Sequence, residues 1–540
     1  MLKMVDGTGI IGVDMVCPLG GTVSPPQPPN FDKVEMEGVG SLMLPNSLKA
    51  PLERVELLGN SVQGENPAPD NPQEIKSAGR KSKNLFNIAD LRVGQVQKDG
   101  TINEKSTHYR TATLDVPEDA KYRITFKTNT DYNMIYFTDA YINGVHSNPY
   151  VKVYGGNSGS LISLKNGKNI LSFRATKDDA TIDFPKDHNI MIAEESETLD
   201  YESYGYFFDL KITGKNLLSN KPTDWMIGKT TSWGAVPQTP VSYGKNVKNA
   251  IATINVKSST NYSFINKETN KLWVCRIIEL DANGLGLVNH ALYANESFNY
   301  KKYNFSTRSN TANIVFEIKK VDNTELLSTD IESNKIMLVE GEVNEPTPYE
   351  PYTEQSMQIV LNEPLRGIGE YKDVLTKDGV VRKIYPPYEI NLNDLRDGGY
   401  SRTNTVMFSV KVQNKTVGYA SLKPSILCNI LPDCALQMSN VYNNDKECIA
   451  VGGGIVLFRV NKSRLKDISS FEAIKQSFIE LMEGKKMLVE YALETPVTEP
   501  LPESVQQQLQ ALHSENGVTH VFVDSGEVPC GIKLTYRKEK

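Results

Sequence analysis

The 540-residue sequence predicts a mainly β protein made of tandem antiparallel β-sandwich domains of jelly-roll type, with an extended Pro-rich N-terminal region and one late α-helix packed on a sheet. Short runs in which apolar and polar residues alternate are separated by turn dipeptides such as Asn143-Gly144, as in sandwich proteins. Helical periodicity is almost absent, and two phrases recur along the chain. These observations together indicate repeated β modules.

The closing phrase occurs three times. It reads HNIMIAEESETLDYESYGYF from His188, NKIMLVEGEVNEPTPYEPY from Asn334 and KKMLVEYALETPVTEPLPE from Lys485. Each copy passes from an Ile-Met or Met-Leu core through glutamates into a stretch rich in Tyr or Pro. A recurring ending implies recurring modules, and the Tyr- and Pro-rich stretch is then punctuation between them.

The opening phrase occurs twice, as KNLFN at Lys83 and KNLLSN at Lys215. It marks two related modules, at about residues 84–206 and 216–352, which are too long for solenoid repeats and fit tandem domains. The third ending closes a segment that starts near Ile384 and lacks the opening phrase. That segment is either a relative of the first two or a different module.

Five parts follow from these phrases and from composition. They are an N-terminal attachment or assembly region with a Pro-rich linker (1–80), β-sandwich module 1 (81–208), β-sandwich module 2 (209–355), a connector plus a third β-rich module with a helix at 469–483 (356–500), and a C-terminal helix-hairpin segment (501–540). In the first part, SPPQPPNF at Ser24 and GENPAPDNPQEIKSAG at Gly64 are typical of extended arms and linkers, and they enclose short strands such as RVELLG.

Strand-like alternation fills the modules. The clearest runs are KYRITFKTN, MIYFTDAYING and NILSFRATK in the first, NAIATINVKSSTNYSFIN, KLWVCRIIELDANGLGLVNHALY and TANIVFEIKK in the second, and TVMFSVKV and GIVLFRV in the third. KIMLVE is expected to be the last, edge strand of module 2, with Ile336, Leu338 and Val343 turned inward. NEPTPYEPY is then a semi-rigid linker whose Tyr349 and Tyr352 pack against the completed domain.

The late helix lies in DISSFEAIKQSFIELMEGKK. Ser469 stands three residues before Glu472 as a capping box, Gly484 occupies the C-terminal cap, and an apolar face (Phe471, Ile474, Phe478 and Leu481) predicts packing on a sheet. The C-terminal part offers a short helix in ESVQQQLQAL and two strands, VTHVFV and GIKLTY. Because a lone hairpin is marginally stable, we expect it to pack on a neighbouring module or an equivalent chain.

Composition excludes several classes of protein. The chain is 39% hydrophobic and 23% charged, which is ordinary for globular proteins, and its net charge of -6 argues against nucleic-acid binding. The N-terminus lacks a signal-peptide core, and no stretch approaches the roughly 20 apolar residues of a membrane span. The six cysteines are scattered and are read as reduced thiols, although Cys428, Cys434 and Cys448 lie close in sequence.

The search for catalytic or metal-binding motifs yields none. No nucleophile elbow, His-Glu-x-x-His helix or phosphate-binding glycine loop is present, and the acidic residues are too many to single out a catalytic pair. ELDANGLGL faintly resembles a calcium loop around Asp281, but the following residues supply no closing glutamate, so a hairpin turn at Asn283-Gly284 is the better interpretation. We therefore expect a protein that is not an enzyme and has no cofactor and no metal.

Aromatic residues in polar, loop-like stretches are the remaining candidates for a ligand site. A Tyr or Trp face suits the apolar face of a sugar ring, and the candidate glycan-binding residues are Trp225 and Trp233 in PTDWMIGKTTSWGAV, Tyr300 and Tyr303 in ESFNYKKYNFS, and Tyr132, Tyr141 and Tyr150 in NTDYNMIYFTDAYINGVHSNPY. The alternative is that these rings close the edges of the sandwich cores. Trp273, within an apolar strand, is assigned to the core.

These residues together resemble the modular tail or baseplate proteins of bacteriophages and prophages that infect Gram-positive bacteria. VELLGNSVQGENPAPDNPQEIKSAG leading into NLFN resembles a linker phrase of those proteins. KNLL, RIIELDANGLGL, KIMLVEGE and PYEPY resemble their carbohydrate-binding-module-like β-sandwiches, and SSFEAIKQSFIELMEGKKMLVEYALETPVTEPL resembles a third recurring unit. The resemblance spans most of residues 50 to 505.

The resemblance implies a virion protein of the phage tail, baseplate or tail fibre, assembled in the host cytoplasm and released by lysis. It implies host cell-wall or surface polysaccharide as ligand, other tail or baseplate proteins as partners, and a homotrimer or larger ring. Two functions stay open: a receptor-binding protein that adheres without catalysis in host adsorption, and a purely structural assembly component. A depolymerase is a third, weaker alternative.

Overall fold

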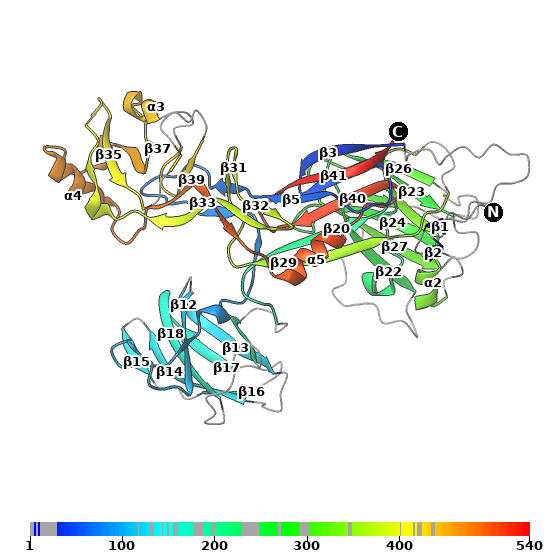
Figure 1. The fold of residues 1–540 in the computed structure, drawn as a ribbon, viewed down its shortest axis with the longest axis horizontal. Coiled ribbons are helices and arrows are strands. Elements are labelled where there is room, and N and C mark those ends of the chain that lie inside the picture. Colours follow the sequence, from blue (N-terminus) through cyan, green and yellow to red (C-terminus); the bar gives the residue numbers. More distant parts are fainter. Residues whose placement is uncertain are drawn as a thin grey trace, which may run out of the picture.

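The computed structural model describes residues 5–6, 9–10 and 30–540, with gaps at 117, 129–133, 143, 148–150, 155–159, 176–187, 196–200, 228–247, 268–271, 292–301, 321, 323, 344–347, 400, 414–415, 418–423 and 434–437. The protein is mainly β, with many antiparallel sheets and few short helices. The sheets form one central scaffold and three modules attached to it (Figure 1).

The central sheet has twelve strands in the order β29-β20-β40-β4-β41-β5-β32-β33-β39-β36, with β3 beside β41 and β8 beside β20. Its strands are β3 (Phe31–Val39), β4 (Ser41–Ser47), β5 (Arg54–Leu58), β8 (Arg80–Lys81), β20 (Tyr206–Thr213), β29 (Glu354–Leu361), β32 (Val374–Thr376), β33 (Gly379–Glu389), β36 (Ile426–Cys428), β39 (Leu488–Glu499), β40 (Gly517–Asp524) and β41 (Gly531–Glu539). Strands from both ends of the chain therefore belong to one sheet.

The structure corrects two sequence predictions here. The predicted C-terminal hairpin is wrong, because β4 lies between β40 and β41 and pairs with both. The predicted extended arm is wrong for residues 31–47, because β3 and β4 are strands of the same sheet, whereas the strand predicted in RVELLG is confirmed as β5. The physical reason is that GIKLTY has a buried face (Ile532, Leu534 and Tyr536), and the N-terminal strands supply the partners that complete it.

Module 1 contains two sheets. The larger has the order β15-β14-β18-β12-β9, with β16 also paired to β14, and the smaller has the order β17-β13-β19. The strands are β9 (Arg92–Val93), β12 (Tyr109–Val116), β13 (Ala120–Thr128), β14 (Met134–Ile142), β15 (Val145–Ser147), β16 (Val151–Tyr154), β17 (Ser160–Leu164), β18 (Gly167–Ala175) and β19 (His188–Glu194). Both sheets contribute to one apolar core, which includes Phe86, Tyr122 and Phe173.

Module 2 repeats this arrangement. Its sheets have the orders β25-β24-β27-β22-β21 and β26-β23-β28. The strands are β21 (Met226–Ile227), β22 (Asn249–Asn255), β23 (Asn261–Asn266), β24 (Leu272–Leu280), β25 (Gly286–Ala291), β26 (Lys302–Ser306), β27 (Asn313–Lys320) and β28 (Ile336–Glu340). Taken in chain order, each strand occupies the same place in its sheet as its counterpart in module 1.

Module 3 is a reduced copy of the same topology. Its four-stranded sheet has the order β34-β35-β38-β37, which matches β9-β12-β18-β14 and β21-β22-β27-β24. The strands are β34 (Arg396–Asp397), β35 (Thr405–Lys411), β37 (Cys448–Gly452) and β38 (Ile455–Asn461). In place of β13-β19, it has β36-β39, and β39 continues into the central sheet. The open question about this segment is answered in favour of a relative.

Buried asparagines explain why the recurring phrases travel together. Asn84 of the opening phrase donates to the carbonyl of Ile190 and accepts from the N–H of Ile192, both in the closing strand β19. Asn216 does the same with the corresponding residues of β28. In module 3 the clamp comes from Asn429, which donates to the carbonyl of Lys486 and accepts from the N–H of Leu488. Module 3 lacks the opening phrase, and Asn429, from the middle of the module, makes these hydrogen bonds instead of an asparagine at its start.

Each module is inserted at the end of an antiparallel strand pair of the central sheet. Module 1 lies between β8 and β20, module 2 between β20 and β29, and module 3 between β33 and β39, and the two strands of each set pair with each other. Figure 1 shows module 3 at one end of the molecule, module 2 beside the opposite end of the sheet, and module 1 separate from both. The modules thus resemble very large hairpin loops on a common scaffold.

The closing strand of module 2 agrees with the prediction. β28 pairs only with β23, so it is an edge strand, and Ile336 and Leu338 lie in the module core. Met337 and Val339, on the other face of the strand, are buried in a second cluster against which Val343 and Tyr349 pack, so the prediction that Val343 shares the core face with Ile336 and Leu338 is wrong. Tyr349 also donates from its hydroxyl to the carbonyl of Asn334, so it packs on the module as expected. Tyr352 is 8% exposed, and Lys211 of β20 and Lys221 lie over its ring.

The late helix is confirmed with a shifted cap. Helix α4 (Phe471–Leu481) begins after Ser470, whose hydroxyl accepts from the N–H of Ala473, so Ser470 replaces the predicted Ser469. Gly484 has a φ of 73°, the left-handed conformation expected of a C-terminal cap. Phe478 packs against Phe408 of β35, with ring centroids 5.2 Å apart, so the helix does cover a sheet.

The remaining elements are short. They are helices α2 (Ser328–Glu332), α3 (Met438–Asn443) and α5 (Glu503–Ala511), 3-10 turns η1 (Ile88–Asp90), η2 (Pro222–Asp224), η3 (Leu392–Asp394) and η4 (Lys462–Arg464), and strands β1 (Val5–Asp6), β2 (Gly9–Ile10), β6 (Ser61–Gln63), β7 (Ile75–Ser77), β10 (Gln95–Val96), β11 (Ile102–Asn103), β30 (Gly367–Ile368) and β31 (Tyr371–Lys372). No helix in the described part of the chain has the length and apolarity to cross a membrane.

Cysteine pairing departs from the sequence prediction at one position. Cys428 and Cys530 are buried free thiols, as expected, but Cys448 is disulfide-bonded. The prediction that all six cysteines are reduced is therefore wrong.

Candidate functional site

The predicted sugar platform at Trp225 is not exposed. The Trp225 side chain is 0% exposed in the core of module 2, and its indole N–H donates to the carbonyl of Ser219 at 2.9 Å. A buried ring with a satisfied N–H cannot receive a ligand face, so the core-closing alternative holds for this residue. Trp233 lies outside the described residues, as does the side chain of Trp273.

The tyrosine candidates do not meet at one place. Tyr303 is half-buried, and its hydroxyl lies 3.1 Å from Nδ1 of His290, whose Nε2 lies 2.8 Å from Glu279. Glu279 is fully buried, and although desolvation opposes ionisation, hydrogen bonds from Thr311 and His290 lower its pKa. This chain of contacts ties Tyr303 to the interior of module 2.

Tyr141 lies in module 1, where its ring covers the turn at Gly100. Tyr300, Tyr132 and Tyr150 lie outside the described residues. The structure thus brings none of the described candidates into a shared aromatic surface.

The interpretation of ELDANGLGL as a turn agrees with the structure. Asp281 accepts hydrogen bonds from the N–H groups of Asn283 and Leu285, and Gly284 has a φ of 78° between β24 and β25. The described residues contain no cluster of His, Cys, Asp and Glu that suits a metal ion.

The most elaborate polar site lies at the neck between the central sheet and module 3, where β33 and β39 separate. Arg382 pairs with Val497, whereas Ile384 pairs with Ala492. A single residue of β33, Lys383, therefore lies opposite residues 493–496 of β39. The N–H groups of Lys383 and Ile384 both donate to Oδ1 of Asp373, at 2.7 and 3.1 Å. Such convergence of consecutive N–H groups is the mark of a β-bulge.

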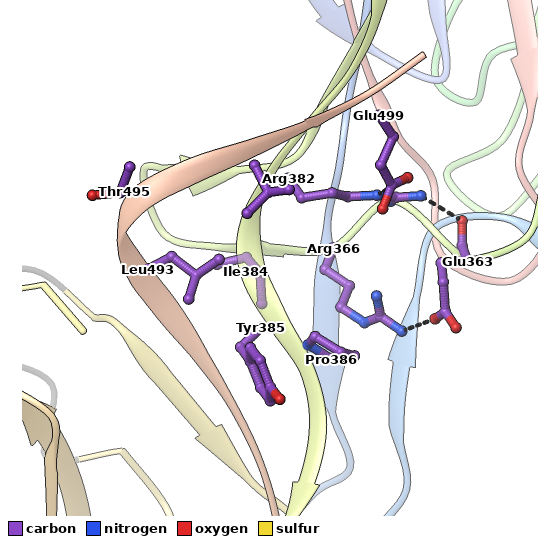
Figure 2. Close-up of a pocket in the computed structure, with 10 residues that line it drawn as sticks. Glu363, Arg366, Arg382, Ile384, Tyr385, Pro386, Leu493, Thr495 and Glu499 are labelled. Carbon is purple, nitrogen blue, oxygen red and sulfur yellow. Dashed lines mark hydrogen bonds and ion pairs between the residues drawn. The ribbon is translucent and has the colours of Figure 1, made fainter. Parts of the chain in front are cut away.

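The separation of the two strands opens a cleft of about 320 Å³ (Figure 2). This volume is within the range of roughly 300–1,000 Å³ that is usual for small-molecule sites. The cleft is lined by Glu363, Arg366, Arg382, Ile384, Tyr385, Pro386, Leu493, Thr495, Val497 and Glu499. In Figure 2, the apolar residues and Tyr385 occupy its middle, and the guanidinium groups point to the glutamates at one side.

Arg366 anchors the inner wall of the cleft. Its side chain is 5% exposed; Nε donates to Glu490 at 3.2 Å and Nη2 donates to Glu363 at 2.6 Å. Burial raises the pKa of Glu490 to about 7, in opposition to the lowering effect of Arg366 and of the Ser61 hydroxyl. The Glu490 carboxyl therefore changes charge near neutral pH while it holds the guanidinium in place.

Arg382 anchors the opposite wall. Its Nε donates to Glu499 at 2.9 Å, and Nη1 donates both to the buried Asp373 at 3.2 Å and to the carbonyl of Pro364 at 2.6 Å. Because each buried arginine has at least two anionic or carbonyl partners, the walls are held in one geometry.

Tyr385 forms the aromatic part of the cleft. Its ring stacks on the buried ring of Tyr491, with centroids 5.0 Å apart and an angle of 12° between the planes. This stacking holds one face of the Tyr385 ring against Tyr491, and the half-buried Tyr385 side chain lines the cleft. The cleft thus combines fixed cationic donors, exposed carboxylate acceptors, an aromatic ring and an apolar floor.

Sequence reasoning missed this cleft because its residues come from three separated segments, 363–366, 382–386 and 493–499. A local signal is present in the prolines 386 and 387, which interrupt an otherwise alternating strand, since proline within a strand is confined to edges and bulges. Nothing in the sequence pairs that interruption with Arg366.

A second hollow, of about 840 Å³, lies between module 2 and the central sheet. Next to it His520 is 1% exposed, and burial lowers its pKa to about 3, so the ring is neutral. Tyr352 and Phe522 line this hollow, together with residues of β20 and β22.

Comparisons with known proteins assign no family. No protein-family model and no curated protein matches the chain. Among solved structures, the arabinofuranosyltransferase AftD from Mycobacteria matches with 8% identity and a TM-score of 0.13, over 94% of this chain and 36% of that enzyme. A GH78 family rhamnosidase of Bacillus sp. GL1 matches with 10% identity and a TM-score of 0.11, over 86% and 56% of the two chains. These similarities are too low to support a fold or a function.

Proposed function

We propose that the chain is a virion protein of the tail, baseplate or tail fibre of a phage or prophage of Gram-positive bacteria. In this role it binds host cell-wall or surface glycans without catalysis, through sandwich modules of jelly-roll, carbohydrate-binding-module-like type. Its partners are other tail or baseplate proteins and copies of itself in a trimer or larger ring.

The observation that carries the proposal is the threefold repetition of one two-sheet topology on one scaffold. Binding modules that are individually weak gain avidity of roughly 10² to 10⁴ when they are linked and can engage together. β3 and β41, which are far apart in the sequence, pair in the central sheet, so all three modules project from one continuous scaffold. Such an arrangement suits a component of a particle.

A purely structural role is the alternative, and one observation favours it. The neck of module 3 is crossed by a buried network of Arg366, Glu490, Arg382 and Asp373, which fixes the neck rather than leaving a flexible linker. A rigid neck suits a spacer or assembly surface, which must hold its neighbours at a fixed distance.

The test uses the full-length purified chain and walls isolated from bacterial strains that such a phage infects. Adhesion predicts that the protein sediments with the walls and releases no soluble sugar. Absence of binding to walls from every sensitive strain contradicts adhesion and favours the structural role. Release of reducing ends contradicts the non-catalytic role.

A further inference from the structure

We propose that the cleft between β33 and β39 is a binding site for one neutral, hydroxyl-rich sugar residue. This inference rests on the proposed function, in which a surface glycan is the ligand, and names the place and the chemical class of that ligand. It moves the ligand site from the module loops to the neck that joins module 3 to the scaffold.

Hydrogen-bonding capacity in the cleft is incompletely used. Arg366 donates from Nε to Glu490 and from Nη2 to Glu363, and its Nη1 has no hydrogen-bond partner in the described part of the chain. The Glu363 and Glu499 side chains are 52% and 48% exposed, and each uses only one carboxylate oxygen in its arginine contact. The cleft thus contains one fixed donor and two available acceptors, which is the combination that neighbouring hydroxyls of a sugar satisfy.

The charge of the lining selects against ionic ligands. Each arginine faces two carboxyl groups, Glu363 and Glu490 for Arg366 and Glu499 and Asp373 for Arg382, so neither sign of charge is left uncompensated at the cleft. An anionic ligand would face the two carboxylates, and a cationic ligand would face the two guanidinium groups, so each would give up hydration against a like charge. A neutral polyol pays no such penalty and can hydrogen-bond to both kinds of group.

The apolar part of the cleft supplies the second requirement. A pyranose has C–H groups on one face, and Tyr385 presents an aromatic ring that is already oriented by its stacking on Tyr491. Ile384, Leu493 and Val497 extend the apolar surface beside it. Because the donors and the ring are fixed before binding, little conformational entropy is lost when a ligand enters.

A matched pair of tryptophan substitutions on one strand tests the site. Val497 lines the cleft and is 55% exposed, so Val497→Trp fills the cleft at little cost to the core. Thr498 is exposed, and because side chains alternate along a strand it points to the opposite face, so Thr498→Trp is the control.

The probes are methyl glycosides of glucose, galactose, rhamnose and N-acetylglucosamine, with methyl glucuronide and methyl glucosaminide as anionic and cationic comparators. Binding to the full-length chain is measured by saturation-transfer NMR and titration. We expect at least one neutral glycoside to bind, both charged comparators to bind more weakly, Val497→Trp to weaken binding by at least about tenfold, and Thr498→Trp to stay within about twofold.

Equal weakening by both tryptophan variants, unchanged binding in Val497→Trp, or no neutral glycoside bound at all overturns the site. The wall-sedimentation assay is run on the same variants. If Val497→Trp still sediments with walls like the unmodified chain, the cleft proposal fails while the adhesive function stands. If neither the unmodified chain nor any variant sediments with walls, the adhesive function fails. The cleft is then tested by the glycoside titration alone.

Discussion

Removal of the Asn84 clamp is expected to unfold module 1 without affecting module 2. Asn84 is 2% exposed, and its side chain makes four hydrogen bonds, two of which join the opening phrase to the closing strand β19. Its Oδ1 accepts from the N–H groups of Phe86 and Ile192, and its Nδ2 donates to the carbonyls of Ile190 and Glu202. Asn84→Ala deletes all four at once.

The magnitude follows from what is left unpaired. Three of the four hydrogen bonds of Asn84 lie in buried surroundings, and each buried group that loses its partner costs roughly 1–3 kcal/mol. We therefore expect module 1 to lose about 3 to 9 kcal/mol of unfolding free energy, which is a large part of the roughly 5–15 kcal/mol that stabilises a typical domain. Asn84→Asp keeps the acceptors but places a carboxylate oxygen against two carbonyls, so it also destabilises.

Hydrogen exchange followed by mass spectrometry resolves the two modules. In Asn84→Ala, peptides from β12 and β18 should exchange faster, whereas peptides from β22 and β27 should not change. Asn216→Ala should give the reverse, because its clamp has the same geometry. Asn87→Ala is the control, since Asn87 is only half-buried and its side chain caps η1, which is worth about 1 kcal/mol.

Two results would refute this reasoning. Unchanged exchange in both modules would mean that the clamp contributes nothing to stability. Faster exchange in both modules after either substitution would mean that the two phrases do not delimit independent modules.

Three further predictions concern the neck, the core of module 2 and the scaffold. Since burial raises the pKa of Glu490 to about 7 from an ordinary value of 4.5, the folded neck holds a proton that the unfolded chain has released; the associated stability is present below pH 4.5 and is lost as pH rises through 7. Denaturation at pH 5 and 8 should differ by about 3 kcal/mol for this neck, and Glu490→Gln should reduce the difference. Trp225→Ala should cost module 2 about 3 to 5 kcal/mol, measured by urea unfolding, and Trp225 should resist acrylamide quenching because it is buried. Replacing module 1 by an Asn-Gly turn between Ser82 and Gly205 should leave a folded scaffold, since Lys81 already pairs with Tyr206, and circular dichroism and gel filtration would detect a collapse of the remaining sheets.

Local patterns in the sequence were sufficient to predict the modules. Strand alternation, the Asn-Gly turn and the recurring phrases report on contacts within a few residues or on repeated sequence, and they predicted the edge strand at Ile336 and the helix near Ser470 within one residue. The shift from Ser469 to Ser470 reflects two adjacent residues that are equally able to cap.

The central sheet and the cleft could not be predicted in the same way. β41 pairs with β3 across almost the whole chain, and no local pattern specifies the partner of an apolar strand. The cleft depends on a bulge that sets residues 493–496 against one residue of β33, and on the distant Arg366. Trp225 was misjudged because a polar stretch around a ring does not reveal whether the ring turns inward.

The mode of insertion links the repeated modules to the proposed role. Each module enters and leaves through strands that pair with each other, so its ends are held about one strand spacing apart, near 4.8 Å, whatever the module contains. The entropy of closing such a loop rises only slowly with its length, so a module can grow, shrink or be replaced at little cost to the scaffold. Module 3 shows the reduced case: it retains the strand order with fewer strands, and β39 connects it directly to the sheet. Such a scaffold allows the inserted modules to differ while the central sheet keeps its shape. The cleft lined by Arg366 and Arg382 lies where one strand, β39, belongs both to a module and to the scaffold.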